Sequence, residues 1–222
     1  MDTEAMTARR AWASVSPVPR PKMAKVLTPS REPVCRFDAI EHQYFIDGEE
    51  VPHITGMLDN VNLIDDAWLT EEGRERGQIV HRLAADFDLG AIADPRQVEN
   101  IYKGWFLAHV AAMRTIRPTW TAVEQAIISV AHRFGGRPDR VGRVWGAWAV
   151  VDLKTGTRSA ATPIQTALQA ILAAPGLRLP PTAIVRYELD LKKNGKWELF
   201  EHTDRRNFDK AYEVIRDCAK AA

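Results

Sequence analysis

The chain has 222 residues, 45% of them hydrophobic and 27% charged, and its 30 basic and 29 acidic side chains give a formal net charge of +1. This length suits one domain with a substantial core, and no apolar run reaches the roughly 18 residues of a membrane-spanning helix. Two cysteines, Cys35 and Cys218, are too few for a disulfide framework, a four-cysteine zinc site or a four-cysteine iron–sulfur cluster. We therefore expect a cytoplasmic protein without a secretory leader, a membrane segment or an iron–sulfur cluster.

The first 35 residues differ in composition from the rest. They contain five prolines and scattered basic side chains, and they show no sustained hydrophobic period. Such a segment is typical of a disordered, basic and proline-rich arm, and composition favours this interpretation over an arm that binds nucleic acid. Residues 36–222 are then predicted to form a single domain.

The domain begins with short β-prone runs. Residues 36–40 and 43–46 are followed by the tight-turn pair Asp47-Gly48 and by a third run at 49–51, which together predict a small antiparallel sheet. A short helix is predicted from Thr55 onward.

Two longer helices are predicted next. The first is capped by Asp65 or Asp66 and runs to Leu89, because apolar side chains recur at helical spacing and Gly90 ends the pattern. The second covers residues 94–113.

The remaining pattern alternates strands and helices. It predicts strands at 119–131, 137–144 and 147–154, a helix at 162–174, a hairpin of strands 182–191 and 196–202, and a last helix from Thr203 or Asp204 to about 219. This order predicts an α/β fold with a mixed central sheet flanked by helices.

A pair of carboxylates stands out in the hairpin turning at Trp145-Gly146. If the turn is centred there, residue numbers of facing pairs sum to 291, and Asp139 lies opposite Asp152. Like charges opposed across a sheet destabilise it unless a cation lies between them. Hard oxygen ligands of this kind suit Mg²⁺.

Lys154 follows Asp152 by two residues, so both side chains lie on one face of the strand, roughly 7 Å apart along it. A metal-binding carboxylate with an ammonium beside it is suited to phosphoryl transfer. The lysine would orient or deprotonate a metal-bound water and offset charge on the transition state. The same spacing in Asp190-Leu-Lys192 has no partner carboxylate strand before it, and we regard that pair as a decoy.

The motifs together resemble the RecB-type, phage exonuclease branch of the PD-(D/E)xK nuclease superfamily. That branch carries Gly-x-x-x-His on an early helix, Glu on a first strand, Gly-x-x-Asp on a second, Asp-x-Lys-Thr-Gly on a third, and Gln on the next helix. The corresponding positions here are Gly77 to His81, Glu124, Gly136 to Asp139, Asp152 to Gly156, and Gln165. The resemblance implies a restriction-endonuclease-like core.

The resemblance also implies roles for these residues. His81, Asp139, Asp152 and the Leu153 carbonyl would hold a divalent metal, with Glu124 assisting. Catalytic roles would fall to Lys154, Asp139, Asp152, Glu124 and Gln165, with Lys154 as the catalytic lysine and Gln165 orienting it or the scissile phosphate. Mg²⁺ is the expected cofactor, and Mn²⁺ is expected to support activity. Gln169 departs from the pattern, because relatives often have an aromatic residue there.

Some of these residues also have structural explanations. An isolated histidine such as His81 is more often structural than a ligand, and only the full pattern favours a metal role. Trp145 and Trp148 could stack on bases, although packing in the core or sheet explains them more simply.

The segment 133–158 holds six basic and two acidic residues, a local charge of +4 within a nearly neutral chain. It therefore supplies DNA-contact candidates, namely Arg133, Arg137, Arg140, Arg143 and Arg158.

The expected function is a metal-dependent exonuclease that degrades linear DNA in phage-type recombination, within the bacterial cytoplasm. The alternatives are a structure- or sequence-specific endonuclease on the same core, and a catalytically silent DNA- or protein-binding module. Expected partners are DNA ends, a single-strand annealing or binding protein, and further copies of the chain.

Overall fold

The computed structural model describes residues 32–64, 70–92 and 94–221. The predicted arm therefore lies almost wholly outside the described residues, as do the expected cap residues Asp65 and Asp66. Pro33–Ala222 forms one compact unit.

A small antiparallel sheet opens this unit, as predicted. Its strands are β1 (Cys35–Asp38), β2 (Gln43–Ile46) and β3 (Glu49–Val51). Asp47 and Gly48 both have positive φ, which is the backbone of a tight hairpin turn. The short helix α1 (Ile54–Asn60) begins one residue earlier than expected, because His53 caps it by accepting a hydrogen bond from Gly56 N.

The central sheet has five strands in the order β10-β9-β8-β7-β4. Its members are β4 (Thr119–Val123), β7 (Arg140–Val144), β8 (Ala147–Lys154), β9 (Val185–Leu191) and β10 (Trp197–Glu201). Strands β8 and β9 are parallel, and the other neighbours are antiparallel. In the β7–β8 hairpin Arg140 faces Val151, so the predicted register is confirmed. The fold is the predicted mixed α/β type.

The predicted strand 119–131 is wrong in one respect, because β4 ends at Val123 and the backbone changes direction at Glu124. The φ of Glu124 is 49°, a left-handed conformation that no strand contains. Beyond the break, β5 (Ile127–Ser129) leaves the central sheet and pairs with β6 (Phe134–Gly136). The expected strand at 137–144 correspondingly begins only at Arg140.

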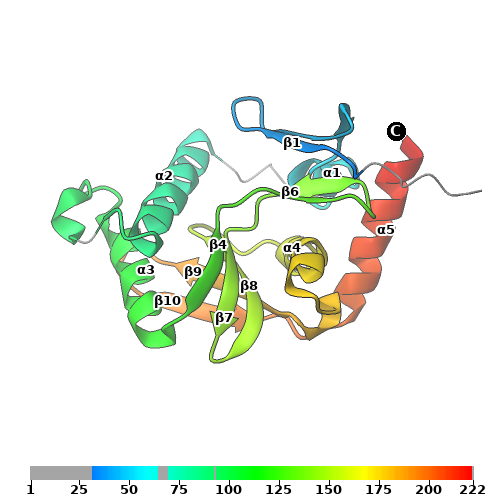
Figure 1. Cartoon of the computed structure of the whole chain (residues 1–222). Helices are drawn as coiled ribbons and strands as arrows, with labels where there is room; N and C mark the ends of the chain where they lie inside the picture. Colours follow the sequence, from blue (N-terminus) through cyan, green and yellow to red (C-terminus); the bar gives the residue numbers. More distant parts are fainter. Residues whose placement is uncertain (1–31, 65–69, 93, 222) are drawn as a thin grey trace, which may run out of the picture. The chain divides into compact units, whose positions relative to one another are not determined.

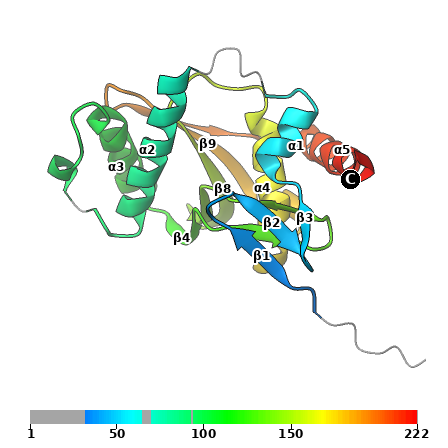
Figure 2. The same cartoon turned by 90° about the horizontal axis from the view of Figure 1, so that it is seen from above.

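The helices cover the two faces of the central sheet, as Figures 1 and 2 show. One face packs on α2 (Glu71–Asp88) and α3 (Lys103–Ile116), and the other on α4 (Thr162–Leu177), and α5 (Arg206–Ala221) packs against the outer side of α4. Because strand residues alternate, the odd-numbered Val151 and Leu153 of β8 face α2 and α3, whereas Val150 faces α4. None of the described helices is both long and apolar enough to cross a membrane.

Several helix boundaries differ from those predicted. Within the described residues α2 begins at Glu71, where the Thr70 hydroxyl accepts from Gly73 N. The expected helix 94–113 is divided into a 3₁₀ turn, Pro95–Gln97, and α3, because the turns between them bury Val98 against α3. A second 3₁₀ turn, Pro181–Ala183, replaces the start of the strand expected at 182.

Candidate active site

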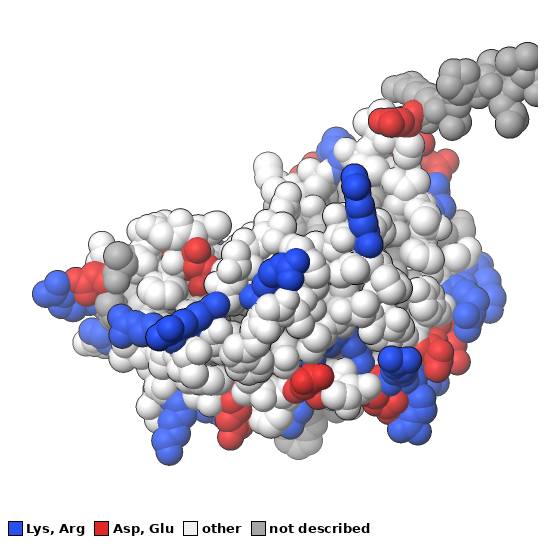
Figure 3. Space-filling model, turned by 60° about the horizontal axis from the view of Figure 1, so that its bottom comes forward, with Lys and Arg blue, Asp and Glu red and all other residues white. Residues whose placement is uncertain are grey.

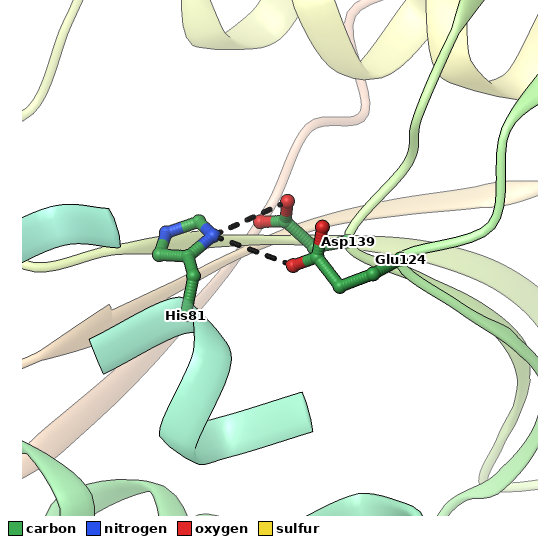
Figure 4. Close-up of side chains that lie close together, drawn as sticks. All are labelled: His81, Glu124 and Asp139. Carbon is green, nitrogen blue, oxygen red and sulfur yellow. Dashed lines mark ion pairs between the residues drawn. The ribbon is translucent and has the colours of Figure 1, made fainter. Parts of the chain in front are cut away.

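Three ligand-bearing side chains from separate segments meet at one end of the central sheet. His81 comes from α2, Glu124 from the break after β4, and Asp139 from the bend before β7. One ligand atom of each lies within 4.8 Å of the others. Figure 4 shows the His81 ring directed between the two carboxylates, with Nδ1 3.4 Å from Asp139 Oδ1 and 3.6 Å from Glu124 Oε1.

The second ring nitrogen of His81 fixes the orientation of the imidazole. Nε2 lies 3.1 Å from the carbonyl oxygen of Leu153, which can only accept, so Nε2 donates this hydrogen bond. The Leu153 carbonyl therefore lies at the opposite ring nitrogen from the one that faces Glu124 and Asp139. This contact links α2 to β8.

A backbone hydrogen bond to Asp139 stabilises the left-handed conformation of Glu124. Glu124 N donates to the backbone oxygen of Asp139 at 2.9 Å, so the two carboxylate-bearing residues are tied through the main chain. A left-handed non-glycine residue costs about 1–3 kcal/mol and persists where the surroundings enforce it, often at functional sites. Here the left-handed backbone takes the Glu124 carboxylate out of the strand and into the group.

Charge within the group is balanced by a proton on His81. Burial alone would lower the pKa of His81, but the carboxylates of Asp139 and Glu124 raise it to about 10. Burial opposes ionisation of Asp139, but the His81 charge, hydrogen bonds from His81 and Leu153 N, and the Lys154 charge lower its pKa to about 2. An imidazolium thus lies between two carboxylates, at a place where a cation is electrostatically favoured.

The donor set fits a divalent metal ion. Glu124 Oε1 is buried and accepts no hydrogen bond among the described residues, which leaves a ligand oxygen free to coordinate. Two carboxylates and one imidazole suit Mg²⁺ or Mn²⁺, since oxygen ligands favour both ions and imidazole suits transition metals. A coordinating imidazole must be neutral, so metal binding through Nδ1 would displace the proton from His81.

Asp152 lies in a neighbouring group rather than among these ligand atoms. Its Oδ2 is 2.7 Å from Lys154 Nζ, and its Oδ1 accepts from Gln165 Nε2 and Gln169 Nε2, both at 2.9 Å. Lys154 Nζ also donates to Gln165 Oε1 at 3.1 Å. The ligand atoms that lie within 4.8 Å of one another are therefore those of His81, Glu124 and Asp139, and Asp152 contacts Lys154 instead.

Lys154 is positively charged in this environment. Burial would lower its pKa, but the carboxylates of Asp152, Asp139 and Glu188 raise it. Burial is also the largest influence on Asp152 and raises its pKa, against the opposing effect of Lys154. Lys154 is therefore suited to stabilising negative charge rather than to accepting a proton.

Gln169 is a site residue that sequence reasoning missed. It was set aside because it departs from the aromatic residue common at this position, yet it is buried and hydrogen-bonded to Asp152. The available signal was its spacing. Gln165 and Gln169 are four residues apart on α4, so both amides face β8.

Arg140, Asp88 and His109 form a buried network of hydrogen bonds and ion pairs next to the ligand group. Arg140 Nη1 donates to the Asp139 backbone oxygen at 2.7 Å and lies 3.5 Å from Glu124 Oε1. Its Nε is 2.6 Å from Asp88 Oδ2, and His109 Nε2 is 3.0 Å from Asp88 Oδ1. Burial lowers the pKa of His109, against the effect of Asp88, so a neutral ring donating to Asp88 fits the contact. Asp88 lies seven residues after His81, on the same helix.

The network corrects the expected role of Arg140. Its side chain is completely buried, so it cannot contact DNA at the surface. The other candidates are spread over the molecule. Arg137 pairs with Glu124 at 3.2 Å, Arg158 with Glu188 at 3.1 Å and Arg133 with Glu49 at 2.6 Å.

Arg143 lies at the far end of the β7–β8 hairpin, where it donates to Gly146 O and covers the Trp148 ring. Trp145 is 65% exposed, but its ring packs edge-to-face on Tyr187 of β9 with the ring centres 6.0 Å apart, in keeping with the expected packing on the sheet. Trp148 is partly buried. A count of charges along the segment therefore does not describe one surface.

Comparison with known protein families gives one match, in which residues 58–222 correspond to the PD-(D/E)XK nuclease superfamily. The match covers most of the chain and contains every residue of the site. A comparison with curated proteins gives no match. The chain belongs to the PD-(D/E)XK nuclease superfamily.

Proposed function

We propose that this chain is a divalent-metal-dependent deoxyribonuclease, and specifically an exonuclease that hydrolyses phosphodiester bonds at the ends of linear DNA. The observation that carries the hydrolytic assignment is the presence of two groups side by side at one end of the central sheet. His81, Glu124 and Asp139 offer a ligand set, and Lys154 offers a fixed ammonium beside it. The exonuclease assignment rests on the resemblance of the motifs to recombination exonucleases.

One group of residues would bind the metal, and Lys154 would stabilise charge on the phosphate. His81, Glu124 and Asp139 would hold Mg²⁺ or Mn²⁺, and the ion would supply an activated water and neutralise charge on the phosphate. The Lys154 ammonium stabilises negative charge as it develops on the phosphoryl oxygens. Gln165 and Asp152 hold that ammonium in place through contacts of 3.1 and 2.7 Å.

Digestion of end-labelled linear DNA, with closed circular DNA as control, tests this proposal. We expect linear DNA to be degraded from its ends with Mg²⁺ or Mn²⁺, and covalently closed circles to remain intact. Nicking of the circles would assign an endonuclease on the same core. Binding without cleavage in every divalent metal would assign a catalytically silent scaffold.

The proposal extends to partners of a recombination exonuclease, namely a single-strand annealing or binding protein and further copies of this chain in an oligomer. It also extends to the bacterial cytoplasm as the place of action. Sedimentation of the purified chain, alone and with an annealing protein, measures both kinds of association.

A further inference from the structure

The end of the sheet that carries Lys154 also carries a second turn. Strands β8 and β9 are parallel, and Lys154 lies beside Asp190 in their register. The turns that follow both strands therefore emerge at the same end. Lys193 follows Asp190 by three residues, so its turn lies at the same end of the sheet as Lys154.

This β9–β10 turn, residues 192–196, is basic and surrounds a cavity of about 460 Å³. The lining residues are Lys192, Lys193, Asn194, Lys196, Trp197 and Glu198. Lys192 is engaged by an ion pair with Asp190. Lys193 and Lys196 are exposed, and no ion pair with a carboxylate of the described residues holds either ammonium. Glu198 is the one acidic residue of the lining.

Arg76 of helix α2 lies beside this turn. The Arg76 guanidinium and the Lys193 ammonium both lie over the Trp105 ring, at 5.3 and 5.8 Å from its centre. Arg76 Nε is buried without a hydrogen-bond acceptor among the described residues. Arg76 also approaches the turn after Lys154, because a Cβ on Gly156 would lie 3.7 Å from its Nη2.

The packing fixes the position of the basic turn. A Cβ added to Gly104 at the start of α3 would collide with the Lys193 carbonyl oxygen, so this glycine allows the turn to lie directly against the helix. Trp105 follows Gly104 and supports the two cations. The cationic groups are thus held at a set distance from Lys154.

We infer that Arg76, Lys193 and Lys196 bind the phosphate backbone of the DNA strand that enters the active site. This inference rests on the proposed function and adds the path of the substrate. A strand whose end is held at the ligand group would pass this turn with the phosphates that follow its end. Flexible, exposed ammonium groups suit phosphates, which position a nucleic acid without reading its sequence.

An equally basic surface at the opposite end of the sheet provides a matched control. Arg114, Arg117 and Arg143 line a cavity beside the exposed Trp145, at the turn that ends β7. Figure 3 brings this end of the molecule forward and shows separated blue side chains on a largely uncharged surface. It lies five strand residues beyond the ligand group along β7, so DNA bound at the metal centre has no reason to contact it.

The test compares two double variants that remove the same charge. K193Q/K196Q is measured against R114Q/R117Q in steady-state cleavage of linear DNA at several salt concentrations. We expect K193Q/K196Q to raise KM roughly tenfold or more, with kcat unchanged, and to reduce the slope of log(kcat/KM) against log salt by about two. We expect R114Q/R117Q to behave as wild type.

Equal KM values and salt slopes for the two double variants would overturn the inference while leaving the nuclease assignment in place. DNA binding in EDTA, followed by fluorescence anisotropy, keeps the two claims separate. If the wild-type chain cleaves no DNA, the nuclease assignment is wrong. DNA binding that is weaker for K193Q/K196Q but not for R114Q/R117Q would still support phosphate binding by the β9–β10 turn. Equal binding by both variants, or no binding by wild type, contradicts it.

Discussion

The ligand group of His81, Glu124 and Asp139 differs from the Lys154 group in how its charges are satisfied. In the ligand group two carboxylates face one imidazolium, Glu124 also lies near Arg137 and Arg140, and Glu124 Oε1 accepts no hydrogen bond among the described residues. In the Lys154 group the ammonium, Asp152 and two glutamine amides contact one another within 3.1 Å, although Gln169 Oε1 lacks a donor among the described residues. In the first group a metal ion can replace the proton on His81, whereas the second group keeps its ammonium. Variants should therefore separate metal binding from catalysis.

The largest effect is expected for K154A. Removing the ammonium takes away charge stabilisation in the transition state, which is typically worth about 10²–10³-fold in kcat. We expect kcat to fall about 10³-fold while Mn²⁺ affinity stays within a few-fold of wild type, as measured by cleavage rates and calorimetric titration.

Lys192 is the matched control for this variant, because it has the same spacing from Asp190 and a similar ion pair on the neighbouring strand. We expect K192A to keep kcat within about threefold of wild type. Comparable losses of kcat in K154A and K192A would contradict the distinction between the two pairs.

The next effect is expected at Asp88, which supports the ligand group through Arg140. D88N weakens the buried ion pair, so Arg140 holds the Asp139 backbone and Glu124 less firmly. Loss of a residue that orients metal ligands typically costs about 10–100-fold in metal affinity or activity. We expect Mn²⁺ affinity and kcat to fall together in this range, with KM for DNA unchanged.

The free energy of unfolding provides a second test of the network of Arg140, Asp88 and His109. Because R140M leaves Asp88 buried without its cation, we expect it to lower the free energy of unfolding by about 3–5 kcal/mol in urea titration. Retention of wild-type stability by R140M and of wild-type metal affinity by D88N would show that the network is not a support.

A smaller effect is expected for Q169L. The variant removes one of two amide donors to Asp152, and a hydrogen bond to a charged group is worth about 1.5–3 kcal/mol. Since Gln165 remains, we expect the loss of kcat to be about tenfold and Mn²⁺ affinity to be unchanged. A fall in metal affinity with unchanged kcat would place Gln169 with the ligand group instead.

The smallest effect is expected for W145A at the opposite end of the sheet. The side chain is largely exposed, and surface substitutions of this kind change stability by about 0.5 kcal/mol or less. We expect kcat, KM and metal affinity within about twofold of wild type. A raised KM would indicate that this tryptophan stacks on substrate bases.

Local patterns predicted the core of the site because the β7–β8 hairpin has a simple turn and regular register. Counting outward from Trp145-Gly146 brought Asp139 and Asp152 to neighbouring positions, and the structure has that register. The spacing of Gln165 likewise predicted an amide on the helix after β8. The hairpin register and the position of Gln165 both follow from the regular residue spacing of strands and helices.

The remaining features depend on tertiary contacts. Glu124 was placed within a continuous strand, because propensity gives no signal for a left-handed glutamate. Arg140 was assigned to DNA because its partner Asp88 is 52 residues away in sequence. No local pattern marks Lys193 and Lys196, because only the parallel pairing of β8 with β9 places them at the same end of the sheet as Lys154. Charge counted along the chain missed both relations.

Calorimetric titration of Mn²⁺ into the wild-type chain, D139N and K154A tests the central claim most directly. The wild-type chain and K154A are predicted to bind the ion with similar affinity, and D139N is predicted to lose measurable binding, because Asp139 is a ligand and Lys154 is not. Undiminished binding by D139N, or no binding by the wild-type chain, would contradict a metal centre built on His81, Glu124 and Asp139.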